Sequence, residues 1–182
     1  MLVIVGESAS GKSTLQKMFI EANPQYKKAV TYTTRPMRNG EVDGVDYHFI
    51  SQDEFDELKQ RGFFVEYAQY REWSYGTAKT DCNGDNIVAV LTPAGMRALK
   101  RLGIDTTTVY LYVDRRSRMI KILSRGDAID EAYRRNLSDL GQFDSVADEV
   151  DYVIDNTGYH LDEQGVLECL NAIVNEAKKN GN

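Results

Sequence analysis

The chain has 182 residues, of which 42% are hydrophobic and 27% charged, and this composition predicts one soluble globular body with a sizeable core. Its 28 acidic and 22 basic residues give a net charge of −6, which argues against a broad basic surface for nucleic acid or an anionic membrane. The two cysteines, Cys82 and Cys169, form no metal or disulfide pattern, and the apolar start is too short for a signal peptide or membrane span, so we expect a cytoplasmic protein.

The first predicted element is a buried strand at Leu2–Val5 that runs directly into a loop of small residues. The loop fits the phosphate-binding pattern G-x-x-x-x-G-K-[ST], with the residues Gly6, Glu7, Ser8, Ala9, Ser10, Gly11, Lys12 and Ser13. Its glycines let successive N–H groups point inward at the start of the following helix, where they hold phosphate groups. We expect this loop and Thr14 to bind a nucleotide's phosphate chain, with Lys12 at the outer phosphates and the Ser13 hydroxyl on Mg²⁺.

The rest of the chain alternates apolar runs with helical patterns. Buried strands are predicted at 86–91, 108–113 and 152–154, and helices at 11–22, 93–102, 115–123, 130–143 and 161–178. This alternation indicates an α/β fold with a parallel sheet. Between residues 29 and 80 the pattern changes to short β-like pieces with one helix at Gln52–Gln60, so we predict a core of residues 1–29 and 81–182 with a lobe inserted at 30–80.

The inserted lobe carries two motifs, TYTTRPMRNGEVDGVDYHFIS and FVEYAQYREWSYGTAK. Their arginines suit a phosphate, and their glutamate suits the edge of a base, so the pair favours a nucleoside monophosphate. Here the sequence resembles the guanylate kinase family. The run T-T-R-x-x-R-x-G-E-x-x-G-x-D-Y is specific to that family, and the resemblance continues through the SRG at 124–126 to the final YVIDN.

The resemblance implies a three-layer P-loop NTPase core, a mixed β/α monophosphate-binding lobe and a short helical lid at about 121–136. It implies ATP with Mg²⁺ as the phosphoryl donor, GMP or dGMP as the acceptor, and small nucleotides as partners. Phosphate-binding roles carry over by position to Arg35, Arg38, Tyr47 and Tyr75. Guanine-facing roles carry over to Thr31, Glu66 and Thr77. In the lid, Arg125 with Arg134 or Arg135 would close over the transferring group.

Two segments depart from the family pattern. Val90 and Thr92 stand where the family has acidic residues near Mg²⁺ and guanine, and we expect Thr92 to face the base with its hydroxyl. Asp114 could contact Mg²⁺ through water or could cap the helix that follows it. In the lid, Lys121 stands where an arginine is usual and Asn136 replaces another arginine.

Other functions remain open at this point. A kinase of the same fold could phosphorylate another nucleotide or a ribose phosphate, which the missing acids favour. A non-catalytic guanylate-kinase-like binding module is a second alternative, and a plain NTPase switch is a third. The intact Lys12 and Ser13 argue against the binding module, and the lobe motifs argue against the switch. The sequence does not predict the oligomeric state.

Overall fold

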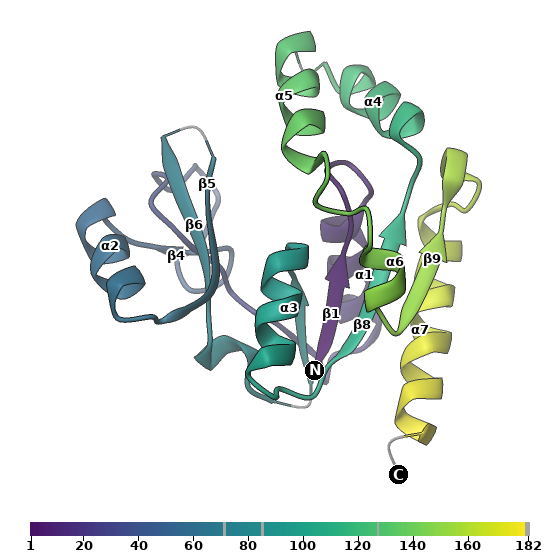
Figure 1. Ribbon diagram of the computed structural model, residues 1–182, viewed down its shortest axis with the longest axis horizontal. Helices are drawn as coiled ribbons and strands as arrows, with labels where there is room; N and C mark the ends of the chain where they lie inside the picture. The colour runs from purple at the N-terminus through teal and green to yellow at the C-terminus, as the bar shows by residue number, and fades with distance from the viewer. Residues whose placement is uncertain (71, 85, 127, 181–182) are drawn as a thin grey trace.

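The computed structural model describes residues 1–70, 72–84, 86–126 and 128–180 (Figure 1). Its core is a five-stranded parallel sheet in the order β2-β7-β1-β8-β9. These strands are β1 (Leu2–Val5), β2 (Lys27–Lys28), β7 (Ile87–Val90), β8 (Thr107–Tyr112) and β9 (Tyr152–Asp155). The predicted α/β class is confirmed. The sequence missed β2, because two exposed lysines carry no apolar signal.

Alternating side chains of the strands divide the core into two apolar layers. Leu2 and Ile4 pack on the side of α1 (Lys12–Ala22) and α7 (Glu163–Asn180). Val3 and Val5 pack on the other side, with α3 (Pro93–Arg101) and the short α6 (Val146–Glu149). Because successive residues of a strand point to opposite faces, four apolar residues in a row place this strand in the interior of a three-layer structure.

Two further helices, α4 (Arg115–Ser124) and α5 (Ile129–Asp139), project from the end of the sheet at which β1 and β8 terminate (Figure 1). The prediction of a helix over 130–143 was wrong at its end. Leu140 has an extended backbone, and Gly141 has a φ of 77°, which stops the helix.

The stretch between β2 and β7 forms a second, mixed sheet in the order β4-β3-β6-β5. Its strands are β3 (Tyr32–Thr33), β4 (His48–Phe49), β5 (Phe64–Tyr70) and β6 (Trp73–Ala78). Helix α2 (Gln52–Gln60) begins with a capping box between Ser51 and Glu54 and stacks Phe55 on Phe64 at 4.6 Å. His48 packs against the Tyr32 ring, with 4.4 Å between the ring centres.

Figure 1 shows the second sheet beside the core and shows α4 and α5 above the core. The loop after β1 lies at the upper end of the core sheet, below these two helices. None of the helices in the described part of the chain has the length and apolar character needed to cross a bilayer.

Candidate active site

The phosphate loop joins β1 to α1 and follows the curled path that its glycines permit. Gly11 has a φ of 103°, and a Cβ on Gly6 would lie 2.6 Å from the Leu111 carbonyl oxygen. Both positions therefore require glycine. The Ser10 hydroxyl is buried and has no hydrogen-bond partner among the residues described. A buried donor without a partner fits a loop built to bind an anion.

Lys12 is the first residue of α1, and its side chain folds back over the loop. Its Nζ donates to the Glu7 carbonyl oxygen at 2.7 Å. Burial lowers the pKa of Lys12 to about 8, although the nearby carboxylates of Asp139 and Glu7 act in the opposite direction. A phosphate placed in the loop would give this ammonium a charged partner in place of a carbonyl.

The Ser13 hydroxyl is the loop oxygen that could bind a divalent cation. In the described ranges, no group of three or more His, Cys, Asp or Glu side chains could hold a metal ion. Mg²⁺ usually keeps several waters and takes only one or two protein oxygens together with nucleotide phosphates. Ser13 is exposed and fits Mg²⁺ that arrives with a nucleotide.

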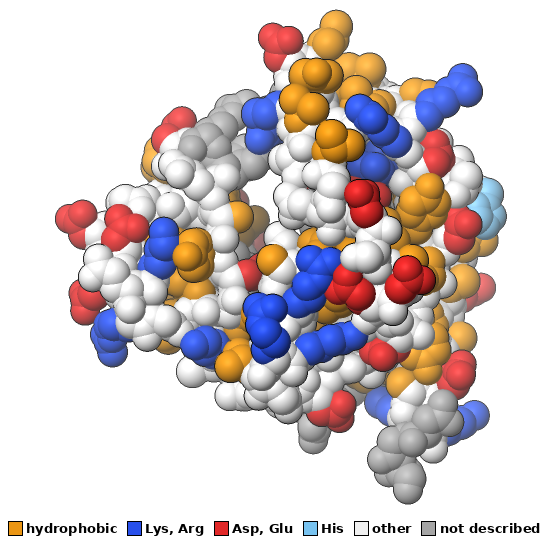
Figure 2. Space-filling view, viewed as in Figure 1, with side chains coloured by type: hydrophobic (Ala, Val, Ile, Leu, Met, Phe, Trp, Pro, Cys, Tyr) orange, Lys and Arg blue, Asp and Glu red, His pale blue; other side chains and the backbone are white. Residues whose placement is uncertain are grey.

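A groove of about 680 Å³ lies between α1 and the second sheet. Ser13 and Gln16 line it on one side, and Thr31, Tyr47 and Tyr75 line it on the other. Figure 2 shows the molecule hollowed between the second sheet and the core. The groove therefore brings one end of the phosphate loop opposite residues of both lobe motifs.

Arg35 and Arg38 differ sharply in environment although they are three residues apart. Arg35 is 8% exposed, donates to Glu41 Oε1 at 2.6 Å and lies 5.4 Å from the centre of the Tyr47 ring. The hydrogen bond to Glu41 raises the pKa of Arg35 above its ordinary value. The Arg38 side chain is exposed, and its backbone N–H donates to the same Glu41 carboxylate at 2.7 Å. Glu41 thus orients the segment that holds both arginines.

Glu66 on β5 is held at the N-terminus of α3. Its Oε2 accepts the Thr92 N–H at 3.0 Å and also the Thr92 hydroxyl, and Thr77 binds the same carboxyl group. Burial raises the pKa of Glu66, although these hydrogen bonds act against the rise. Thr92, expected to face a base, directs its hydroxyl to Glu66 and caps α3 through Gly95 N–H at 3.2 Å.

The predicted lid residues lie at the end of α4 and on α5. Arg125 is the C-cap residue of α4, and Arg134 and Arg135 lie on α5. Asp114 caps α4: its two oxygens accept Ser117 N–H at 2.9 Å and Gly158 N–H at 2.8 Å. These bonds lower the pKa of Asp114 to about 2. The helix-capping interpretation of Asp114 is therefore confirmed.

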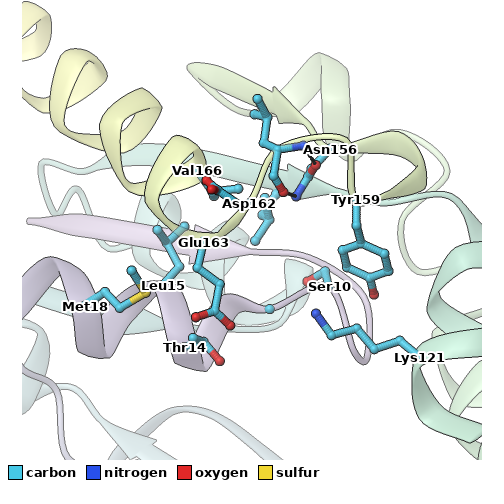
Figure 3. Close-up of a pocket in the computed structure, with 13 residues that line it drawn as sticks. Ser10, Thr14, Leu15, Met18, Lys121, Asn156, Tyr159, Asp162, Glu163 and Val166 are labelled. Atoms are coloured by element: carbon cyan, nitrogen blue, oxygen red, sulfur yellow. Dashed lines mark hydrogen bonds between the residues drawn. The ribbon is translucent and has the colours of Figure 1, made fainter. Parts of the chain in front are cut away.

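A second pocket, of about 250 Å³, was missed in the sequence. It lies between α1, α4 and the loop after β9 (Figure 3). Lys121 lies 4.2 Å from the centre of the Tyr159 ring, and the Tyr159 hydroxyl donates to Ala9 of the phosphate loop at 2.7 Å. Glu163 points toward Thr14 across the pocket (Figure 3). The segment NTGYHLD at 156–162 was the available signal, since it follows a buried strand as the phosphate loop does.

Comparison with known proteins gives a consistent result. The family model described as guanylate kinase matches residues 1–172. The guanylate kinase of Aliivibrio fischeri is 33% identical over 180 residues, which cover 94% of this chain and 87% of that protein. The guanylate kinase of Symbiobacterium thermophilum is 32% identical over 162 residues, or 86% of this chain and 77% of the relative.

Among solved structures, the guanylate kinase of Anaplasma phagocytophilum aligns with a TM-score of 0.66 over 97% of this chain and 85% of its own. At 19% sequence identity, this match supports the fold. The phosphate loop, the second sheet and the family match over residues 1–172 lead to one conclusion. The chain belongs to the guanylate kinase family.

Proposed function

We propose that this protein is an ATP-dependent phosphotransferase that converts GMP, and also dGMP, to the diphosphate. The observation that carries the proposal is the groove that places Ser13 of the loop opposite Tyr47 and Tyr75 of the lobe. A phosphate loop alone would serve any NTPase, whereas this groove offers a second nucleotide a place beside the first.

Phosphoryl transfer needs in-line positioning and cations around the transferring group, and no general base is required. Lys12 binds the outer phosphates of ATP, and Ser13 holds Mg²⁺, which neutralises charge on those phosphates. Arg35 and Arg38, with Tyr47 and Tyr75, hold the acceptor phosphate in the lobe at 30–80. Arg125 with Arg134 or Arg135 closes the lid, at about 121–136, over the reacting groups, which excludes water.

Glu66 reads the acceptor base. Guanine presents N1–H and an amino group on one edge, and an ionised carboxylate accepts hydrogen bonds from both, while adenine presents an acceptor at N1. Thr92 and Thr77 hold the carboxylate in place, and Thr31 lines the groove. The second pocket, beside Thr14 and Tyr159, receives the adenosine half of ATP.

The free thiols of Cys82 and Cys169 suit the reducing cytoplasm, where ATP and GMP are available. The experiment that tests acceptor choice is a coupled assay with ATP, Mg²⁺ and GMP, dGMP, AMP, CMP, UMP or dTMP. We expect the guanine nucleotides to have the highest kcat/KM. A higher value for any other base would overturn the guanine assignment.

Substituting Gly95 with alanine tests the position of Glu66. A Cβ at Gly95 would lie 2.3 Å from Glu66 Oε2, so the carboxylate must move. We expect the KM for GMP to rise roughly tenfold or more, as when one charged hydrogen bond is lost. Ala94→Ser, at the exposed neighbouring position, is the control. An unchanged KM in Gly95→Ala would show that Glu66 does not contact the base.

The raised pKa of Glu66 also predicts a pH dependence. With its raised pKa, Glu66 keeps its proton to a higher pH than an ordinary glutamate, and a protonated carboxyl accepts hydrogen bonds poorly. The KM for GMP should therefore fall as pH rises through this raised pKa, and Glu66→Gln should lose that component. Both proteins share the titration of the GMP phosphate, so the difference between their profiles reports Glu66. Superimposable profiles would contradict the prediction.

Since the folded protein binds the Glu66 proton more tightly than the unfolded chain does, the Glu66 contribution to folding stability decreases over the same rise in pH.

A further inference from the structure

Four charged side chains from three parts of the chain meet at the phosphate loop. Glu7 and Lys12 belong to the loop, Arg118 comes from α4 and Asp139 from the last residue of α5. Asp139 contacts the loop directly: its Oδ2 accepts the Ser8 backbone N–H at 2.8 Å, and its Oδ1 accepts the Ser8 hydroxyl at 3.3 Å. A carboxylate oxygen thus accepts a hydrogen bond from a backbone amide of a loop that binds anions.

Arg118 lies beside this oxygen, and its position is set by the backbone. Its side chain is only 7% exposed, and its Nε donates to the Val113 carbonyl at 2.9 Å. Its two other nitrogens lie 3.5 Å from Asp139 Oδ2 and 3.5 Å from Glu7 Oε1. Strong hydrogen bonds between ions are shorter, at about 2.7–2.9 Å. The guanidinium therefore has donors that a closer anion could use.

Asn136 adds an independent observation from the same helix. It precedes Asp139 by three residues, which places the two on neighbouring parts of one face of α5. Asn136 is 4% exposed, and its Nδ2 has no hydrogen-bond partner in the described part of the chain. At position 136, where the family resemblance expects a lid arginine, this chain has asparagine. Arg118, on the neighbouring helix α4, supplies a buried cation.

We propose that Asp139 and an oxygen of the donor's phosphate chain compete for the backbone N–H of Ser8. Arg118 then binds the phosphate oxygen that replaces Asp139 there. Arg118 is then a catalytic residue in addition to Lys12. Displacement of Asp139 releases the end of α5, so donor binding is coupled to movement of the lid. This inference rests on the proposed function, because it assigns the phosphate chain to ATP.

The competition is tested with Asp139→Asn, which keeps the size of the side chain and removes its charge. We expect inorganic tripolyphosphate and ATP to bind this variant more tightly, by about tenfold, or 1.4 kcal/mol, in isothermal titration calorimetry. Asp130→Asn removes the same charge from the exposed start of α5 and should leave both affinities unchanged. Equal or weaker binding by Asp139→Asn would overturn the competition, because a purely structural contact predicts no gain.

The role of Arg118 is tested with Arg118→Gln, with exposed Arg116→Gln as the control. ATP should bind Arg118→Gln at least about tenfold more weakly, while adenosine, which lacks phosphates, should bind as before; Arg118→Lys should restore part of the loss. Unchanged ATP binding, or an equal loss for ATP and adenosine, would overturn the assignment. These titrations contain no GMP. If they succeed while no GMP is phosphorylated, the proposed acceptor alone is wrong.

Discussion

Replacing Lys12 with methionine should lower kcat by about 10²–10³-fold or more, the usual loss when one group that stabilises transition-state charge is removed. Methionine keeps the unbranched apolar stem that packs in the loop and removes the ammonium. In the structure this ammonium lies on the Glu7 carbonyl oxygen at 2.7 Å, at the mouth of the anion-binding loop. It can therefore turn to a phosphate without leaving the site.

The same variant should bind GMP with nearly unchanged affinity, because the acceptor residues belong to the other side of the groove. Single-turnover kinetics would measure the transfer step, and calorimetry would measure GMP binding. Lys179→Met is the matched control, since Lys179 is exposed in the last turn of α7, away from the groove and the phosphate loop. Equal losses of transfer and GMP binding in Lys12→Met would contradict this division of roles.

Replacing Arg35 with methionine should raise the KM for GMP by about 100-fold, near the upper range for a charged hydrogen bond. Arg35 is buried and already oriented by Glu41 and Tyr47, so little ordering opposes phosphate binding. Arg38 has to be ordered from an exposed position, and Arg38→Ala should have the smaller effect, near tenfold.

Steady-state kinetics with GMP varied would measure both effects, and Arg61→Met, which changes an exposed arginine after α2, is the control. Thermal unfolding should accompany the assay, because Arg35→Met leaves Glu41 without its ion-pair partner. A folded Arg35→Met variant with an unchanged KM would show that Arg35 serves only to hold Glu41.

The elements with a strong local signal could be predicted from the sequence. Leu2–Val5 and Gln52–Gln60 have the predicted bounds, because one is wholly apolar and the other starts with a capping box. Strand β2 could not be predicted, since Lys27 and Lys28 pair only with β7 at the sheet edge. Its existence depends on a partner strand 60 residues away in the chain.

The candidate site was predictable where residues act within one motif, and less so where they act across the fold. Every residue of the phosphate loop could be identified from the sequence motif. The sequence could not show that Thr92 binds Glu66, or that Asp139 reaches Ser8 across 131 positions. Such contacts depend on tertiary packing, and neither residue stands in a pattern that specifies its partner. The contact between Asp139 and Ser8 shows that the loop already attracts an anion from the chain itself.

Transfer of a phosphoryl group from ATP to GMP can be followed by ³¹P NMR of the wild-type protein with both nucleotides and Mg²⁺. The spectra distinguish GDP from inorganic phosphate in one experiment. We expect ATP and GMP to disappear together and ADP and GDP to appear in equal amounts. Conversion of ATP to ADP and inorganic phosphate without GDP, or no reaction of ATP at all, would contradict this expectation.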